Sequence, residues 1–148
     1  MQNFRRLDVW HRAHTFSLEI QRLVGTLPRG FTDLKSQLSS AADSIPSNIV
    51  EGCGAASRKE LARYLDISIR SAFEVEYRLQ VAHDTDLIDF ATWQDLTREV
   101  IEIRKMLFTF RRAVLKADQA EEDEKRKDTR ARRKRPRRPD ARDDSAQA

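Results

Sequence analysis

Ten of the fourteen residues from Lys125 to Arg138 are lysine or arginine, and Asp128 is the single acid among them. Cations at this density displace condensed counterions from a polyphosphate, which gives binding that depends on salt but not on base sequence. The run has no aromatic residue on which a base could stack. We therefore expect it to bind the phosphates of RNA or another nucleic acid. Its cations are Lys125, Arg126, Lys127, Arg130, Arg132, Arg133, Lys134, Arg135, Arg137 and Arg138.

A smaller group of cations, Arg58, Lys59 and Arg63, stands where a helix is expected to begin. The simplest interpretation of one such cluster is a solvated helical face. Because a basic surface can also contact phosphates, we include these three residues among the candidate nucleic-acid contacts.

Residue types that serve catalysis or metal binding are few and isolated. His11 and His14 could share a helical face, but no HExxH motif or cysteine pair supplies further metal ligands. Cys53 lies at the expected C-terminal end of a helix, where the negative end of the dipole disfavours a thiolate. The sequence shows neither a glycine-rich phosphate loop nor a catalytic triad. We expect no catalytic residue, no cofactor and no metal, and therefore a protein that is not an enzyme.

Four stretches of the chain carry apolar residues at alternating spacings of three and four, the period of one helical face. Short connections make successive helices antiparallel, so the predicted all-α fold is an up-down-up-down four-helix bundle. Thr32 or Asp33 is the expected N-cap of the second helix, and the fourth is expected to begin near Thr92. The four stripes are Val9, Ala13, Phe16, Ile20, Leu23 and Leu27; Leu34, Leu38, Ala41, Ile45 and Ile49; Leu61, Leu65, Ser68, Ala72, Val75, Leu79 and Ala82; and Trp93, Leu96, Val100, Ile103, Leu107, Phe110 and Val114.

The joint between the second and third helices carries several architectural signals. Pro46 removes one backbone hydrogen bond inside the second helix, which predicts a kink. Gly52 and Gly54 can take the left-handed conformation that ends a helix. Ser57 and Glu60 have the S-x-x-E spacing of a capping box, which predicts that the third helix begins there. We expect these five residues to form a structural hinge.

Glu51 belongs to the same hinge but needs a partner. A carboxylate near the negative end of a helix is unfavourable by roughly 0.3–1 kcal/mol. We expect Glu51 to pair with Arg63 or Arg70 on the third helix and so to fasten the joint.

A second set of apolar residues lies off the main stripes. Ile101, Phe108 and Leu115 repeat every seven residues, and Trp10 and Val24 share a face across Ser17. A wide core-facing surface would explain them. A second apolar face used for self-association would explain them as well, and periodicity alone leaves both interpretations open.

The composition changes near residue 117. Residues 1–117 carry 17 Lys or Arg and 15 Asp or Glu, whereas residues 118–148 carry 11 and 9 but almost no apolar residue. The second segment cannot bury enough apolar surface to fold alone. We expect a bundle domain over residues 1–117 and a charged, mostly disordered tail over residues 118–148, with disorder from about Lys125.

The remaining composition indicates a cytoplasmic protein. A single cysteine excludes an intramolecular disulfide and fits a reducing compartment. The first residues lack the apolar core of a secretory signal, and no apolar run is long enough to cross a membrane.

Three segments carry a family resemblance. SIPSNIVEGCGAASRKELARYL resembles the signature of the 23S rRNA intervening-sequence proteins, and FRRLDVWHRAH and IRSAFEVEYRLQVAHD resemble their first and third helices. The resemblance covers roughly residues 4–115. It implies a four-helix bundle that assembles as a homo-oligomeric ring, a homopentamer. The resemblance does not supply an enzymatic activity. It also implies kinship with the accessory proteins of diversity-generating retroelements, which partner a reverse transcriptase and nucleic acid.

These observations together predict a non-catalytic, oligomeric helical-bundle protein that binds RNA or DNA through its basic residues and polybasic tail. The alternative is an interaction scaffold or accessory subunit with no direct nucleic-acid binding. In that case the acidic block at residues 118–124 neutralises the basic run, and the tail serves solubility.

Overall fold

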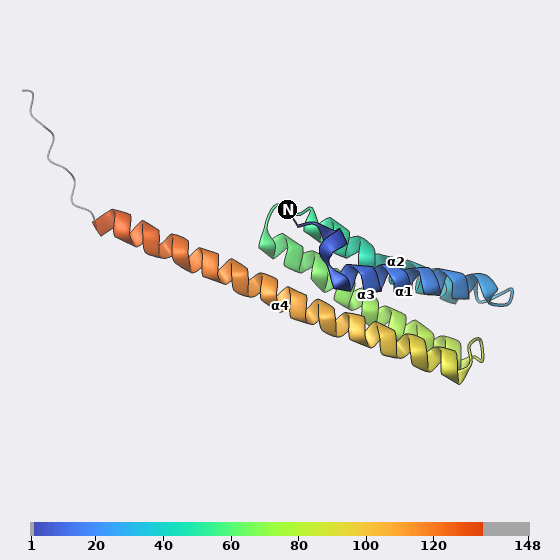
Figure 1. Ribbon diagram of the computed structural model, residues 1–148. Coiled ribbons are helices and arrows are strands. Elements are labelled where there is room, and N and C mark those ends of the chain that lie inside the picture. Colours follow the sequence, from blue (N-terminus) through green and yellow to red (C-terminus); the bar gives the residue numbers. More distant parts are fainter. Residues whose placement is uncertain (1, 135–148) are drawn as a thin grey trace, which may run out of the picture. The chain divides into compact units, whose positions relative to one another are not determined.

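The computed structural model describes residues 2–134, and this part of the chain is helical apart from short turns. A single 3-10 turn, η1 (Phe4–Arg6), precedes four α-helices (Figure 1). The helices are α1 (Asp8–Thr26), α2 (Thr32–Cys53), α3 (Arg58–Asp84) and α4 (Phe90–Lys134). The chain divides into two compact units, Met1–Asp118 and Gln119–Ala148, and the boundary falls within α4.

The four helices of the first unit pack as sequential antiparallel neighbours. Contacts between α2 and α3 join residues whose numbers rise on one helix and fall on the other: Ser44 Oγ lies 2.8 Å from Ser71 Oγ, and Gly52 meets Leu61. The α3–α4 contacts follow the same rule, because Asp66 pairs with Arg111 and Glu76 with Arg104. The predicted antiparallel four-helix bundle is confirmed.

One contact brings the first and last helices together. The guanidinium of Arg12 on α1 donates to both carboxylate oxygens of Glu99 on α4, at 2.9 and 2.8 Å. These hydrogen bonds raise the pKa of Arg12. Each helix of the first unit therefore has two neighbours around a common core.

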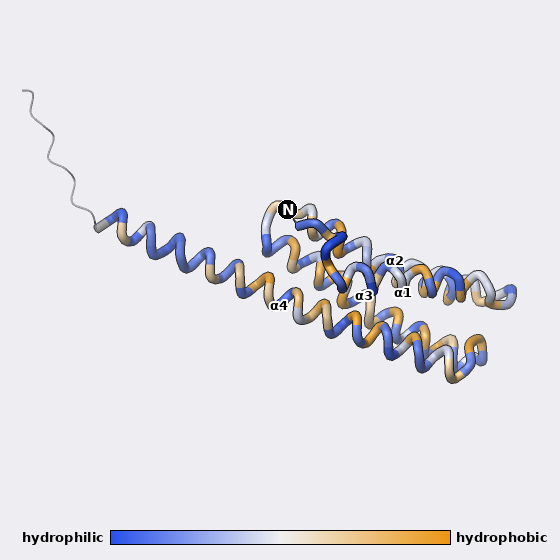
Figure 2. The backbone as a smooth tube through the Cα atoms, in the orientation of Figure 1, coloured by the Kyte–Doolittle hydropathy of each residue, from blue (hydrophilic) through white to orange (hydrophobic). Residues whose placement is uncertain are grey.

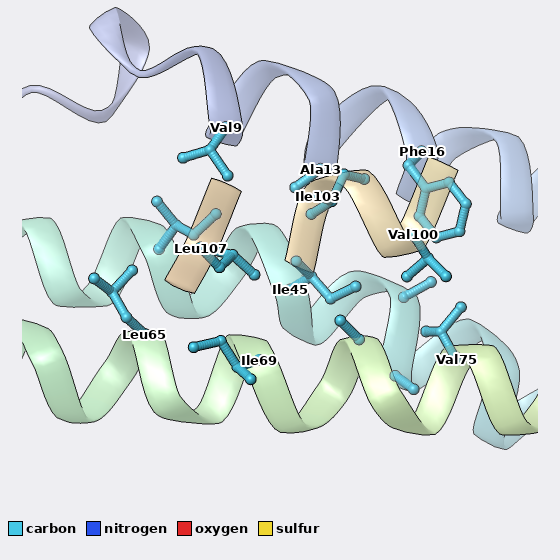
Figure 3. Close-up of a cluster of buried hydrophobic side chains, with 14 of the residues drawn as sticks. Val9, Ala13, Phe16, Ile45, Leu65, Ile69, Val75, Val100, Ile103 and Leu107 are labelled. Atoms are coloured by element: carbon cyan, nitrogen blue, oxygen red, sulfur yellow. The ribbon is translucent and has the colours of Figure 1, made fainter. Parts of the chain in front are cut away.

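Apolar residues recur along α1, α2, α3 and the part of α4 in the first unit (Figure 2). The buried ones form one hydrophobic core. All residues of the four predicted stripes are buried or half-buried. Figure 3 shows side chains from all four helices converging in the interior, among them Phe16, Ile45, Val75 and Leu107. Burial of these stripes supplies the main favourable free energy of the fold.

The helix α2 runs without interruption through Pro46, which is buried. Side chains next to the proline bond to backbone carbonyls of the same turn: Ser47 Oγ donates to the Asp43 carbonyl and Asn48 Nδ2 to the Ser44 carbonyl, both at 2.8 Å. The kink at Pro46 stays a prediction.

Two helix starts differ from the sequence-based expectation. Neither Thr32 nor Asp33 is the N-cap of α2, because Phe31 precedes the helix in a left-handed conformation (φ 50°) and α2 begins at Thr32 itself. The turn is made by backbone geometry and no side chain caps it. The start of α4 is Phe90, two residues before Thr92, because Asp89 Oδ1 accepts from the Thr92 amide at 2.7 Å. Asp89 therefore caps α4.

The expected disorder from Lys125 is wrong for residues 125–134, which are helical. Acid–base pairs one turn apart support this helix: Lys125 pairs with Glu121 at 2.5 Å and Arg132 with Asp128 at 3.0 Å. Eight of these ten residues are lysine, arginine or alanine, which are strong helix formers. Arg135, Arg137 and Arg138 lie outside the described residues.

Candidate functional site

The hinge between α2 and α3 depends on close helix packing at Gly52. A Cβ on Gly52 would lie 2.8 Å from Leu61 Cδ1 and 2.9 Å from Tyr64 Cβ, so no larger residue fits without a shift. The left-handed conformation expected for the two glycines is absent, because Gly52 is helical and Gly54 has φ −85° and ψ −5°. The Gly54 amide instead donates to the Glu51 carbonyl at 3.1 Å. Gly52 is thus a contact residue.

The capping box predicted at the start of α3 is confirmed. Ser57 Oγ accepts from the Glu60 amide at 3.1 Å. Glu60 Oε2 accepts in return from the Ala56 amide at 3.2 Å, one residue earlier than in the standard box. The two bonds fix where α3 begins, and with it the direction of the helix that packs on Gly52.

Glu51 does not fasten the hinge. Its side chain is exposed, and among the described residues no ion pair joins it to Arg63 or Arg70. Arg70 Nε donates instead to the Asp66 carbonyl at 3.3 Å. The expected pairing is therefore wrong, and water solvates the Glu51 charge because the side chain lies at the surface.

The residues considered for chemistry have structural surroundings. Cys53 is buried, and burial raises the pKa of its thiol, which disfavours the reactive thiolate. His14 stacks on Trp10 with ring centroids 5.0 Å apart. His11 Nε2 lies 2.7 Å from the Arg5 carbonyl. Within the part of the chain that the structure describes, no group of three or more His, Cys, Asp or Glu residues could hold a metal ion.

The three cations at the start of α3 lie at the surface of the first unit, and one of them, Lys59, contacts an acid. Lys59 Nζ lies 3.9 Å from Asp118 Oδ2, and Arg58, the first residue of α3, is exposed. Arg63 is exposed one turn along, next to Tyr64 and Ile67. The structure thus places all three candidates on the first two turns of one helix.

Two arginines of α4 serve packing in the first unit. Arg111 Nε lies 2.6 Å from Asp66 Oδ1, and Arg104 pairs with Glu76. The Arg104 guanidinium also lies over the Phe73 ring, 3.9 Å from its centroid. Their positive charges are therefore neutralised by α3.

The second unit presents a different arrangement of cations. Arg126, Arg130 and Arg133 are exposed and follow one another at spacings of four and three on the helix. At about 100° per residue, all three lie within roughly 60° of one helical face. No acidic side chain within residues 2–134 forms an ion pair with any of them. We call these three residues the basic stripe.

Three of the five acids of this segment lie on the opposite side of the helix from the basic stripe, whereas Glu122 and Asp123 lie roughly 40° and 60° from Arg126. Glu121 and Asp128 are roughly 140° and 160° from Arg126 around the helix, and they pair with Lys125 and Arg132. Asp123, one turn before Arg126, accepts from Gln119 Nε2 at 3.0 Å and marks where the stripe begins. Lys127 is exposed beside the stripe, and Lys134 is the last helical residue.

The order of acids and bases in the sequence predicts this helix, although the charged composition favours disorder. The pairs Glu121–Lys125 and Asp128–Arg132 have the i, i+4 order, acid first, that favours helices. Once the segment is helical, the three-and-four spacing of the arginines defines a face.

Three exposed aromatic residues lie on the neighbouring helices α3 and α4 in the first unit. Phe73, Tyr77 and Phe108 have 50%, 59% and 44% of their surface exposed. Tyr77 is one turn from Phe73, and Phe108 is one turn from Arg104, which covers the Phe73 ring. Of the off-stripe residues, Ile101 and Leu115 are half-buried on the same helix. We call Phe73, Tyr77 and Phe108 the aromatic edge.

The family model of the 23S rRNA-intervening sequence proteins matches residues 5–109. The chain belongs to this family. Membership confirms the resemblance carried by the hinge segment and by the first and third helices. The matched range of the 23S rRNA-intervening sequence family ends before the basic stripe.

A solved structure supports the fold of this family member. A crystal structure from Bacteroides thetaiotaomicron, of a protein of unknown function from the S23 ribosomal protein family, is 26% identical to this chain. The two superpose with a TM-score of 0.67 over 70% of this chain and 95% of the other. No curated protein matches the chain. None of the helices in residues 2–134 combines the length and the apolar character that a membrane span requires.

Proposed function

We propose that this 23S rRNA-intervening sequence family protein is a non-catalytic helical-bundle protein that binds nucleic acid through the phosphate backbone. The basic stripe and the cations that follow it in the sequence supply the affinity. The observation that carries the proposal is that Arg126, Arg130 and Arg133 share one exposed face, while Glu121 and Asp128 pair with other cations.

The spacing of the basic stripe suits a phosphate backbone. From Arg126 to Arg133 a helix rises about 10 Å, at 1.5 Å per residue. Phosphates along one strand of a double helix follow every 3.4 Å or so of axis, so three guanidinium groups meet several phosphates over this length. Each neutralised phosphate releases counterions, and the guanidinium fork also donates hydrogen bonds to phosphate oxygens.

Two variants with equal charge test the proposal. Arg126→Gln with Arg130→Gln removes two charges from the basic stripe. Lys125→Gln with Arg132→Gln removes two charges that are already neutralised by acids one turn away. Binding of a labelled RNA to the full chain is measured at moderate salt, and circular dichroism checks the helix content of each variant.

The stripe variant is expected to bind roughly tenfold or more weakly, because two phosphate contacts are lost. The matched variant is expected to lose much less. Equal losses in the two variants, or no loss in the stripe variant, would show that the stripe is not the binding surface.

A second candidate function, an interaction scaffold or accessory subunit, is favoured by the aromatic edge. Monomeric proteins seldom leave three large aromatic side chains this exposed along one edge. The edge would bury itself against a second copy in a homo-oligomer, a pentamer by the family resemblance, or against a protein partner such as a reverse transcriptase. This role is compatible with nucleic-acid binding, since copies in one assembly raise the effective concentration of each other's basic stripe.

Sedimentation separates self-association from a monomer. Phe73→Gln with Phe108→Gln is expected to lower the mass of the assembly, whereas Phe31→Gln, at a residue that is 51% exposed outside this edge, is expected to leave it unchanged. A monomeric wild type, or an assembly that tolerates the first variant, would remove the aromatic edge as a self-association surface.

A further inference from the structure

We infer that the preferred ligand of the basic stripe is a double helix, contacted on the outside along its phosphate backbone. This inference rests on the proposed function and adds the class of nucleic acid. It follows from three properties of the helical segment that carries the stripe.

The first property is the absence of stacking groups. The last aromatic residue of the sequence is Phe110, sixteen residues before Arg126. Proteins that bind single strands gain about 1–3 kcal/mol per base by stacking bases on aromatic side chains. The helical segment has no aromatic side chain to supply this stacking energy, so it can bind a single strand only through the phosphates. Binding of a duplex does not need this stacking energy, because the bases of a duplex are already stacked on one another.

The second property is a fixed charge spacing. The three arginines stand on one helix, supported by the Glu121–Lys125 and Asp128–Arg132 pairs. A rigid row of cations is matched best by a rigid row of anions. A duplex already holds its phosphates in such a row, whereas a single strand must first lose conformational freedom to present one. The duplex also carries twice the charge for the same length.

The third property is that acids occupy the side of the helix opposite the basic stripe. Glu121, Glu124 and Asp128 lie roughly 140–160° around the helix from Arg126. Inside a major groove, phosphates of both strands would surround the helix and meet these acids. The helix therefore fits against one ridge of backbone and does not reach the base edges. Recognition is accordingly independent of base sequence and tolerates both A-form and B-form geometry.

The test compares duplex RNA, duplex DNA and an unstructured single strand of equal length, each titrated against the full chain at the same salt. Both duplexes are expected to bind about tenfold or more tightly than the single strand, with affinities within a fewfold of each other. Arg126→Gln with Arg130→Gln should shrink the duplex preference. Arg98→Gln with Lys105→Gln, at two exposed cations of the first unit that pair with Asp95 and Glu102, should leave it unchanged.

A single strand that binds as tightly as the duplexes overturns the duplex inference while leaving the proposed function in place. A strong preference for one duplex over the other overturns backbone-only recognition. A duplex preference that survives loss of Arg126 and Arg130 shows that the stripe does not cause it. Failure of all three probes to bind would contradict the proposed function itself.

Discussion

Arg111 on α4 and Asp66 on α3 form an ion pair at 2.6 Å between these adjacent helices. Fifteen residues further along the same helix, Arg126 has no such partner among the described residues. The helix α4 therefore carries two kinds of cation. Arg104 and Arg111 in the first unit neutralise acids of α3, and the arginines of the basic stripe keep their charge available for an external anion.

Replacing Arg111 by Gln is expected to affect stability and leave nucleic-acid binding unchanged. Both partners of the pair are about one-third exposed, so solvent screens the interaction and its loss costs roughly 0.5–1 kcal/mol. Urea unfolding measures the cost, and RNA titration measures binding. A loss of affinity as large as that of the stripe variant would contradict the distinction between the two kinds of cation.

Replacing Gly52 by Ala is expected to destabilise the bundle by about 1–3 kcal/mol. The added Cβ would meet Leu61 Cδ1 at 2.8 Å and Tyr64 Cβ at 2.9 Å, and overpacking of this kind forces a shift of side chains or backbone. Thermal or urea unfolding measures the change.

Gly54→Ala is the matched control for this prediction. A Cβ there would stand 3.5 Å from the Glu51 carbonyl oxygen, an ordinary contact, and φ is negative. Its effect should stay within about 0.5 kcal/mol. If the two alanine variants lost equal stability, close packing at Gly52 would not explain the need for glycine.

The Asp89 cap predicts a pH-dependent contribution to stability. Hydrogen bonds from Thr92 lower the pKa of Asp89 in the folded state. A carboxyl whose folded pKa lies below its unfolded pKa stabilises the fold above the unfolded value and loses that contribution as pH falls through the folded one. The stability that Asp89 adds should therefore be complete at neutral pH and decline below about pH 4.

Asp89→Asn keeps a capping oxygen but does not titrate, so the difference in unfolding free energy between wild type and variant isolates this effect. The other carboxyl groups titrate alike in both proteins and cancel. The difference is expected to shrink between neutral pH and about pH 3. A difference that is independent of pH would show that the charge of Asp89 does not matter to the cap.

Removing residues 119–148 is expected to leave a folded bundle and to abolish most RNA binding at moderate salt. The first unit ends at Asp118, and this boundary keeps the Asp118–Lys59 contact. Circular dichroism and thermal unfolding check the fold of the truncated chain. If it unfolds cooperatively and binds RNA as well as the full chain, the affinity lies in the bundle, where Arg58, Lys59 and Arg63 are the first residues to test.

Local patterns in the sequence were sufficient to predict the bundle. The spacing of apolar residues identifies the four core faces, and the Ser57–Glu60 pair identifies one helix start, because both depend on residues within one or two turns. Asp89 was missed as a cap, although an aspartate three residues before Thr92 is the same kind of local signal.

Features set by distant residues could not be predicted in this way. Gly52 is required because Leu61 and Tyr64 approach it from another helix, and nothing near Gly52 in sequence indicates this contact. Glu51 was assigned a partner on electrostatic grounds, but exposure to water removes the need for one. For the basic stripe, composition favoured disorder, whereas the order of acids and bases favours a helix.

The salt dependence of RNA binding tests the proposed function most directly. The logarithm of the association constant is measured against the logarithm of salt concentration for the full chain and for Arg126→Gln with Arg130→Gln. We expect a steep negative slope for the full chain that becomes shallower by about 1.4–1.8 in the variant, since each lost phosphate contact contributes about 0.7–0.9. A slope near zero for the full chain, or an unchanged slope in the variant, would contradict binding through the basic stripe.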